Sequence, residues 1–363
     1  MQRLNSLKQG LCYAETNFRL TYLSSIRKKL LLGGIFLGGV AVIFVFAISI
    51  GALNLSLSQS IKAIFEESDL SYVLWNLRIP RAIGAILAGA SLGVAGAVMQ
   101  NVLRNPLASP FTLGVSQGAA FGAAFAIIVL GAGQTHSYGS EGVTVFKTYP
   151  VVISAFMGSI LTVLAILLLS FLKGVLPEAI ILAGVALSSF FGAMTMFFQY
   201  FASDVQVAAT LFWTFGDIGK AGWLEIKYMF ITFLFCFVYF FLQRWNFNAL
   251  LWGDDSAKSL GVNVKLLRII SMFLSALVVS VCTAFLGIIG FVGLISPHIV
   301  RLICGNDYRF LIPYSALFGS LLLLISDIIA RTILAPAILP VGIITSFAGA
   351  PIFFFLLIKK RRF

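Results

Sequence analysis

Long apolar stretches, separated by short polar segments, are the main pattern of this chain. Windows of about 19 residues predict apolar helices near 30–51, 82–103, 112–131, 150–172, 177–201, 226–243, 311–330 and 339–358. A further stretch, 269–304, has no charged side chain before Arg301. Because a helix needs roughly 20 apolar residues to cross a bilayer, this stretch is too long for one ordinary span and short for two. The pattern predicts an all-α, polytopic membrane protein.

Charged residues near the two ends of the chain determine whether the stretch 269–304 counts as one span or as two. Basic residues flank the first and last spans, namely Arg3, Lys8, Arg19, Arg27, Lys28, Lys29, Lys359, Lys360, Arg361 and Arg362. Cytoplasmic segments of membrane proteins are rich in Lys and Arg, so both termini are predicted in the cytoplasm and the number of spans must be even. Splitting 269–304 near its glycines gives ten transmembrane helices, with a short external turn at Phe285–Ile289.

The composition is that of a chain formed almost entirely by a membrane domain. Of its 363 residues, 60% are hydrophobic and only 10% are charged. The net charge of +12 would suggest a nucleic-acid partner for a soluble protein. Here the basic cytoplasmic segments explain it, and no nucleic-acid partner is expected. We predict a cytoplasmic N-terminal tail at 1–29, a membrane domain of ten helices at 30–358 and a basic cytoplasmic end at 359–363.

The sequence lacks motifs for catalysis, nucleotide binding and metal binding. No G-x-x-x-x-G-K-[ST] loop occurs, and 216–221 (GDIGKA) has the wrong spacing. There is no HExxH motif. His298 has no acidic or Cys partner at ligand spacing, His136 lies in a predicted external loop, and the four cysteines are scattered. We therefore predict that this chain is not an enzyme and binds no metal or cofactor of its own.

Small residues recur at four-residue spacing in two predicted spans. Gly89 and Gly93 share one face of the second span, and Gly118 and Gly122 share one face of the third. Such spacing lets helices approach closely in lipid, where no hydrophobic drive brings them together. The pattern indicates either ordinary tight packing or helices that slide or line a pathway.

Three arginines lie on the side of the membrane where the charge rule predicts few. Arg78 and Arg81 are at the outer mouth of the second span, and Arg331 is at the outer end of the ninth. Asp327 precedes Arg331 by four residues, so the two can pair on one helix face. Ionisable residues inside a span are functional candidates by default, although a pair at a helix end can also simply neutralise itself.

Several segments resemble those of one transport family, in the same order along the chain. They are RIPRAIGAILAGASLGVAGAVMQNVLRNPLASPFTLGVSQGAAFGAA (78–124), LPEAIILAGVALSS (176–189), WTFGDIG (213–219), LLWGDDSAKSLGVNV (250–264), GIIGFVGLISPHIVRLICGNDYRFLIP (287–313) and SDIIARTILAPAILPVGIITSFAGAPIFFFLL (326–357). The sequence is thereby similar to the FecCD family, the permease subunits of bacterial ABC importers for iron-siderophores, haem and cobalamin. The resemblance implies the type II ABC importer permease fold with ten transmembrane helices.

The resemblance implies a docking role for the three outer arginines. Arg78, Arg81 and Arg331 match family positions that receive acidic residues of the substrate-binding protein. Guanidinium groups suit this task because they form bidentate, charge-assisted bonds to carboxylates and stay charged. The alternative is that these side chains only anchor helices at headgroup level.

Two cytoplasmic loops also match functional parts of the family. The loop 250–264 resembles the coupling helix that fits into the ATPase, and its pattern is carried by Gly253, Asp254, Asp255, Ser256, Ala257, Leu260 and Gly261. The loop 173–178, with Val175, Leu176 and Pro177, resembles the cytoplasmic gate. The implied path runs along a dimer interface lined by the third, fifth and eighth spans and a short helix near 206–216. Polar residues that could face this path are Gln100, Ser116, Gln117 and Gln199.

These expectations together describe an importer subunit of the bacterial cytoplasmic membrane. Its implied partners are a second permease subunit, identical or related, two ATPase subunits that bind ATP and Mg, and a periplasmic or lipoprotein substrate-binding protein. Iron-siderophore import is the first choice, and haem or cobalamin import is the alternative. A secondary transporter would need intramembrane carboxylates or broken helices in matched halves, and neither is clear in the sequence. A membrane-embedded enzyme would need a catalytic cluster.

Overall fold

Helices make up nearly all of the regular structure in this chain. The computed structural model describes residues 2–51, 62, 69–132, 148–172, 174–335 and 337–359. Within these ranges there is no β-strand, and one isolated parallel bridge joins Phe215 to Ile288. The prediction of an all-α fold is therefore confirmed.

The helices follow one another along the chain with short connections. The α-helices are α1 Gln2–Ser49, α3 Asp69–Val73, α4 Ile79–Val102, α5 Val115–Ala124, α6 Thr148–Phe171, α7 Pro177–Tyr200, α8 Asp204–Thr214, α9 Trp223–Leu242, α10 Arg244–Leu250, α11 Asp254–Ser259, α12 Val264–Leu286, α13 Val292–Cys304, α14 Tyr308–Thr332 and α15 Val341–Lys359. Two π-helical turns, η1 Leu74–Arg78 and η2 Phe125–Val129, and a 3₁₀ turn, η3 Ile218–Lys220, join them.

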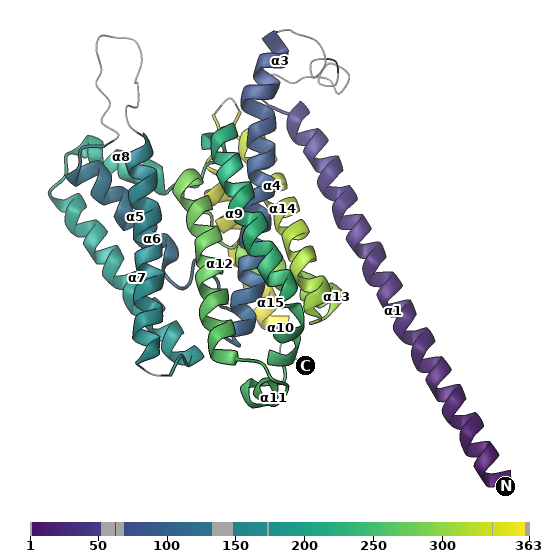
Figure 1. Ribbon diagram of the computed structural model, residues 1–363. Coiled ribbons are helices and arrows are strands. Elements are labelled where there is room, and N and C mark those ends of the chain that lie inside the picture. Colours follow the sequence, from purple (N-terminus) through teal and green to yellow (C-terminus); the bar gives the residue numbers. More distant parts are fainter. Residues whose placement is uncertain are drawn as a thin grey trace.

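Helix α4 lies at the centre of the bundle (Figure 1). It packs against α9, α12, α13 and α14, and nearly all of its residues are buried. Helices α5, α6 and α7 form a second group, with α6 and α5 in contact with α12. Helix α1 packs against α14, and most of its surface between Tyr22 and Ser49 is not covered by the rest of the chain. The small residues around α4 account for its central place, because they let several neighbours approach it at once.

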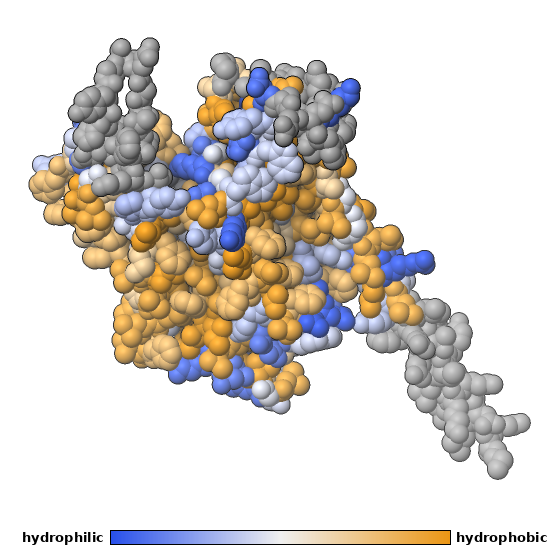
Figure 2. All heavy atoms as spheres, turned by 45° about the horizontal axis from the view of Figure 1, so that its top comes forward, coloured by the Kyte–Doolittle hydropathy of each residue, from blue (hydrophilic) through white to orange (hydrophobic). Residues whose placement is uncertain are grey.

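Seven described helical segments are long and apolar enough to cross a membrane. They are Tyr22–Ser49, Asp69–Val102, Tyr149–Phe171, Pro177–Tyr200, Trp223–Leu242, Val264–Leu286 and Tyr308–Thr332. Three shorter apolar helices, at Val115–Val129, Val292–Cys304 and Val341–Ile352, accompany them. Figure 2 shows hydrophobic residues over the middle of the molecule and hydrophilic residues gathered toward its ends. The polytopic architecture is confirmed, and the number of ten spans stays a prediction.

The predicted domain boundaries fall inside helices. Helix α1 continues from Gln2 to Ser49 across the boundary predicted after residue 29, so the basic tail and the first span share one helix. Helix α15 likewise continues to Lys359, past the boundary predicted after residue 358. Residues 360–363 lie outside the described residues. The division into tail, membrane domain and basic end stays a prediction.

The long uncharged stretch is two helices, as its length and the basic termini predicted. Helix α12 ends at Leu286 and α13 begins at Val292, so the turn covers 287–291, about two residues later than expected. Gly287 has a φ of +82°, and a Cβ there would come within 2.7 Å of the Trp213 carbonyl oxygen. Glycine is therefore the residue that fits at the end of α12, because it tolerates positive φ and close backbone approach.

Two other chain segments, at 216–217 and at Gly342, meet the end of α12 beside this turn. The amide of Asp217 donates to the carbonyl of Leu286 over 2.8 Å, and the amide of Gly342 donates to the carbonyl of Gly216 over 3.1 Å. The ends of α8 and α12 and the beginning of α15 thus meet in one place. Backbone groups that no helix satisfies find partners here, as buried membrane structure requires.

The glycines of the second and third predicted spans serve tight packing within the chain. A Cβ at Gly89 would collide with the carbonyl oxygen of Gly319 in α14, and one at Gly93 with that of Ser315. Gly118 and Gly122 of α5 make the same kind of approach to Gly158 and Ser154 of α6. Of the two interpretations of the sequence pattern, tight packing is the one that describes these four glycines.

Replacing Gly89 with alanine is expected to destabilise the bundle. The new methyl group has no space against the α14 backbone, and overpacking of this kind costs about 1–3 kcal/mol. Thermal unfolding of the purified protein in detergent measures the effect as a lowered melting temperature. Gly38→Ala is the matched control, because nothing lies within 4 Å of a Cβ at Gly38 in α1. Equal melting temperatures of the two variants would contradict the packing argument.

Candidate functional site

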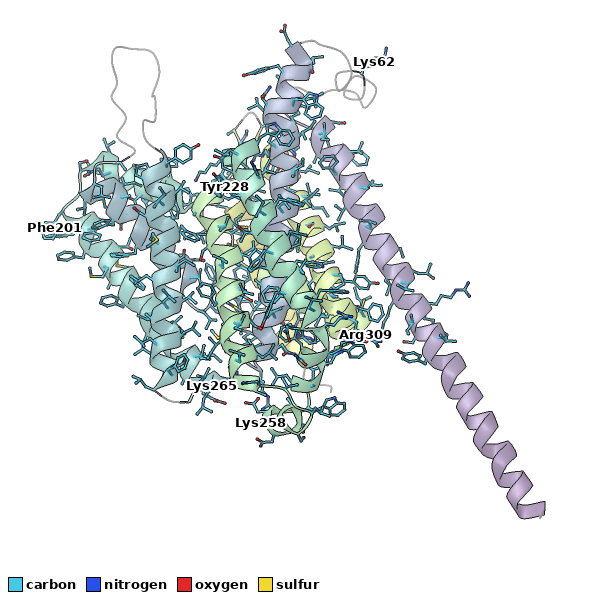
Figure 3. The ribbon with its side chains drawn as sticks, in the orientation of Figure 1. Lys62, Phe201, Tyr228, Lys258, Lys265 and Arg309 are labelled. Atoms are coloured by element: carbon cyan, nitrogen blue, oxygen red, sulfur yellow. The ribbon has the colours of Figure 1, made fainter. Side chains whose placement is uncertain are left out.

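The bundle has two polar ends of different character. Helix α11 and the chain ends lie at one end (Figure 1), where Lys258, Lys265 and Arg309 also lie, whereas Lys62 is at the opposite end (Figure 3). The arginines predicted for docking are found near the Lys62 end, and the residues predicted for coupling and gating are at the α11 end. The structure therefore separates the two predicted sites along the length of the membrane helices.

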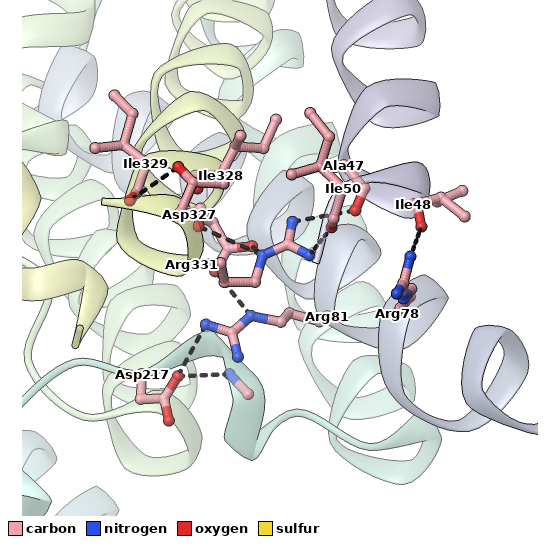
Figure 4. A network of polar contacts seen from close by, with 12 residues as sticks. Ala47, Ile48, Ile50, Arg78, Arg81, Asp217, Asp327, Ile328, Ile329 and Arg331 are labelled. Carbon is pink, nitrogen blue, oxygen red and sulfur yellow. Dashed lines mark hydrogen bonds and ion pairs between the residues drawn. The ribbon is translucent and has the colours of Figure 1, made fainter. Parts of the chain in front are cut away.

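Asp327 is the centre of the first site, and two guanidinium groups meet at it (Figure 4). Its side chain is fully buried. Arg331 Nε lies 3.0 Å from Asp327 Oδ2, which confirms the predicted pair at four-residue spacing. Arg81 Nε donates to Asp327 Oδ1 over 2.9 Å, and Arg81 Nη2 lies 3.3 Å from Asp217 Oδ1. The pair predicted from the sequence is thus part of a network that joins α4, α14 and the turn before η3.

Arg78 and Arg331 hold the C-terminal end of α1. Arg78 Nη1 donates to the carbonyls of Ile48 and Ser49, over 2.9 and 2.8 Å. Arg331 donates to the carbonyls of Ile50 and Ala47, over 2.8 and 3.1 Å. The last carbonyls of a helix have no partner within it and carry partial negative charge, so guanidinium groups are well matched to them.

The three arginines are therefore turned into the protein. Arg78 is 7% exposed and Arg331 is 8% exposed, while 12% of the Arg81 side chain is exposed. Within this chain they bond helix-end carbonyls and Asp327, and anchoring at headgroup level, the alternative raised from the sequence, stays a prediction. Docking of a binding protein through them stays a prediction.

The coupling loop forms the short helix α11 at the other end. Gly253, with a φ of +109°, precedes it, and Asp254 and Asp255 occupy its first turn, where negative charge is favourable. Gly261 has a φ of +83° and stops the helix one residue after its C-cap, Leu260. Trp252 is 82% exposed and Leu260 is 70% exposed, whereas Ala257 is buried. Two large apolar side chains are thus exposed on an otherwise polar turn.

The residues predicted for the gate lie next to those predicted for coupling. A pocket of about 690 Å³ has Leu176, Pro177 and Glu178 on one side and the residues from Trp252 to Ser256 on the other. Val175 is buried beneath it and has a φ of 60°, and Pro177 begins α7. Lys173, the first residue of the predicted gate loop, lies outside the described residues. The fold thus brings together two loops that the sequence could only describe separately.

Sequence reasoning overlooked the residue that joins these loops. Arg268, in the second turn of α12, belongs to none of the motifs described above, yet it is 3% exposed. It binds the carboxylate of Asp254, the carbonyl of Val102 and the carbonyl of Val175. Its position at the start of an apolar span was the available indication, because a basic residue there must find partners when it is buried.

A further polar junction anchors α10 to α14. Asp307 accepts hydrogen bonds from the Arg309 amide, over 3.0 Å, and from the Asn248 side chain, over 3.1 Å. Burial by itself would raise the pKa of Asp307, but the hydrogen bonds from Arg309 and Asn248 outweigh it and hold the pKa below its usual value. The carboxylate is therefore the form that fits this junction, which supports α10 and through it the coupling helix.

The four polar residues predicted for the path differ in their surroundings. Gln100 is buried, donates to the Leu294 carbonyl over 3.3 Å and accepts from Arg301 over 3.0 Å. Ser116 is also buried, whereas Gln117 and Gln199 are partly exposed. The short helix expected near 206–216 is present as α8 and begins with a capping box. The role of these residues in lining a path stays a prediction.

Comparison with known proteins defines the class of the chain as a membrane permease of ABC transporters. MJ0087 of Methanocaldococcus jannaschii, a protein inferred to be an ABC transporter permease, is 53% identical over 93% of this chain and 96% of its own length. The hemin transport system permease protein HmuU of Yersinia pestis is 34% identical over 89% of this chain and 95% of its own. A solved structure of a transporter assigned to the metal-chelate type, in an inward-facing conformation, matches with a TM-score of 0.78. It is 30% identical, and the match covers 90% of this chain and 99% of that one.

The family itself matches nearly the whole chain. The profile of the FecCD transport family covers residues 39–359. The chain belongs to the FecCD transport family and has the fold of a type II ABC importer permease. The resemblance inferred from the ordered motifs is confirmed, as is the transport role that it implied. Among the described residues no group of three or more His, Cys, Asp and Glu gathers that could hold a metal ion.

Proposed function

We propose that this permease carries an iron chelate across the cytoplasmic membrane, with an iron-siderophore complex as the first choice. Family membership, the metal-chelate type of the matching structure and the haemin permease among the relatives all support an iron complex as cargo. Import of haem or of cobalamin is the alternative within the same mechanism. The observation that carries the proposal is the family match over 39–359, and the arrangement of α11 beside the gate residues supports it.

The proposed assembly places ATP hydrolysis on separate subunits. Two ATPase subunits, with ATP and Mg bound to them, would engage α11 of two permease chains, which are identical or related. The exposed Trp252 and Leu260 support this, because aromatic and apolar side chains are typical of the core of a protein interface. A substrate-binding protein would dock at the opposite end of the bundle. Both termini would then be cytoplasmic, on the same side as α11.

Replacing Leu260 with aspartate is expected to weaken assembly with the ATPase. The change puts a charge on an apolar surface that would be buried against the partner, and such a change at the core of an interface costs roughly 2 kcal/mol or more. Co-purification of the ATPase with the tagged permease, at several salt concentrations, measures the loss. Leu31→Ala, on the exposed face of α1, is the control. Alanine is used there because an aspartate in contact with lipid would itself be unfavourable. Full retention of the ATPase by Leu260→Asp would contradict this contact.

Transport by reconstituted protein tests the function. Proteoliposomes containing the permease, its ATPase and its binding protein would be offered radioactive iron bound to hydroxamate, catecholate or citrate, and separately haem and cobalamin. ATP-dependent uptake of one iron chelate that requires the binding protein is the expected result. Uptake driven by an ion gradient without ATP would favour a secondary transporter, and uptake of cobalamin alone would overturn the proposed cargo.

A further inference from the structure

One buried guanidinium joins three cytoplasmic elements that are distant in the sequence. Arg268 Nη2 donates to both carboxylate oxygens of Asp254, over 3.1 and 3.0 Å. Its Nε donates to the Val102 carbonyl over 2.8 Å, and its Nη1 donates to the Val175 carbonyl over 2.9 Å. Asp254 begins the coupling helix α11, Val102 ends α4, and Val175 lies in the turn between α6 and α7. The planar fork of an arginine can serve three acceptors in fixed directions, which a lysine cannot do.

A pocket lies between the coupling loop and the gate loop, so the connection through Arg268 matters for any movement that passes from one loop to the other. The pocket of about 690 Å³ separates Leu176–Glu178 from Trp252–Ser256, so the side chains of these two surfaces are not packed directly on each other across it. Arg268 connects the two sides, through Asp254 on one and through the carbonyl of Val175, the residue before Leu176, on the other. Asp254 also lies 3.9 Å from Arg104, but the Arg104 side chain is half exposed. An ion pair that is exposed and this long is weak.

Val175 is held in a conformation that valine rarely adopts. Its φ is 60°, which is unfavourable for a residue branched at Cβ. The Val175 amide donates to the Ser170 carbonyl over 2.8 Å, and the Val175 carbonyl accepts from Arg268. Such conformations persist only where the surrounding structure holds them, and they are common in segments that switch. Removing the bond from Arg268 would free this turn to change.

We propose that Arg268 is a positioning residue that transmits movement of the coupling helix to the gate turn. A displacement of α11 by the ATPase pulls on Asp254, the guanidinium moves with it, and the bond to the Val175 carbonyl shifts the residues that begin α7. The inference rests on the proposed function, because it needs an ATPase that moves α11. It goes beyond that function in naming the connection between the two loops.

A purely structural role for Arg268 predicts a different result. Capping the carbonyls of Val102 and Val175 requires no carboxylate at position 254, so a structural role predicts that Asp254→Ala lowers the melting temperature, by leaving the buried guanidinium without its acid, but leaves the nucleotide response of the gate turn unchanged. The substitution Asp254→Ala removes the link to α11 and retains both carbonyl bonds. Arg268→Lys keeps the charge but loses the fork, and Asp254→Glu keeps the acid. Lys265→Gln is the matched control, because Lys265 is exposed on the turn of α12 before Arg268 and contacts the ring of Phe171.

The experiment uses the full permease–ATPase complex in lipid nanodiscs and needs no transported substrate. A cysteine at the half-exposed Leu176 reports on the gate turn through its rate of reaction with a membrane-impermeant maleimide. The three described native cysteines are buried, and the same chain without Leu176→Cys gives the background. Rates are compared without nucleotide and with Mg-ATP and vanadate. ATPase activity and melting temperature are measured on the same samples.

The expected result is that nucleotide changes the maleimide rate in the parent complex and in Lys265→Gln and Asp254→Glu. Arg268→Lys should reduce this nucleotide-dependent ratio at least about fivefold, the lower end of usual coupling between sites, while the ATPase remains bound and active. Asp254→Ala should reduce the ratio by a similar factor. An unchanged ratio in Asp254→Ala would overturn the inference. Loss of the ATPase from Asp254→Ala would also overturn it, since Asp254 would then act in docking. Failure of any ATPase to bind the parent chain would overturn both this inference and the proposed function.

Discussion

Replacing Asp327 with alanine is expected to lower the free energy of unfolding by about 3–5 kcal/mol, because it leaves buried guanidinium groups without their carboxylate. Asp327 is fully buried and lies within 3.0 Å of both Arg81 and Arg331. Thermal or denaturant unfolding of the purified permease measures the loss, which would appear in cells as a strongly reduced amount of membrane-inserted protein.

A compensating variant separates charge from packing at this site. Replacing Asp327, Arg81 and Arg331 together with apolar residues of similar size removes the unpaired charges, so it should recover the part of the stability lost in Asp327→Ala that comes from them, although the bonds from Arg331 to the α1 carbonyls are also lost. Asp204→Ala is the control for loss of an acidic residue, because Asp204 is exposed in the first turn of α8. If the triple variant is no more stable than Asp327→Ala, the loss does not come from unpaired charge.

Replacing Arg331 with glutamine is expected to release the end of α1 and to destabilise the protein by roughly 3 kcal/mol. The change removes one of two partners of a buried carboxylate and two charge-assisted hydrogen bonds to α1 carbonyls. Helix α1 touches the rest of the bundle mainly through α14, so these bonds are a large part of its attachment. Hydrogen exchange of the amides near Ala47 should accelerate, and the melting temperature should fall.

The same variant decides between anchoring and docking. An arginine used only to receive a binding protein could be replaced without loss of stability, and capture of the binding protein alone would fall. Lys227→Gln, which removes a positive charge from the first turns of α9, is the control for net charge. If Arg331→Gln has the melting temperature and the exchange rates of Lys227→Gln, the anchoring role is wrong and docking is favoured. If both the melting temperature and the capture of the binding protein fall, Arg331 both anchors α1 and receives the binding protein.

Much of the architecture could be predicted because it depends on local properties of the chain. The apolar windows located the spans, and the basic ends required that 269–304 be two helices, as α12 and α13 are. The turn was placed about two residues early, since hydropathy does not distinguish Phe285 and Leu286, which continue α12, from the residues that follow Gly287. The position of the turn depends on the fit of Gly287 against the carbonyl of Trp213, a contact between segments far apart in the sequence.

The candidate sites were predicted in part for the same reason. Asp327 and Arg331 are four residues apart on one helix, so their pairing could be inferred from spacing. The second partner, Arg81, is 246 positions away, and nothing in the local pattern indicates it. The sequence identified the coupling helix and the gate as separate loops, and it gave Arg268 no role.

The sequence by itself determined that this is a polytopic helical permease of the FecCD family, because hydropathy, charge bias and ordered motifs are properties of neighbouring residues. Only the tertiary structure decided what the ionisable residues do. It turned Arg78, Arg81 and Arg331 inward onto helix ends and onto Asp327, and it brought Val102, Val175 and Asp254 around Arg268. A buried charge requires partners wherever the helix packing supplies them, and that packing joins residues whose distance in the chain carries no information.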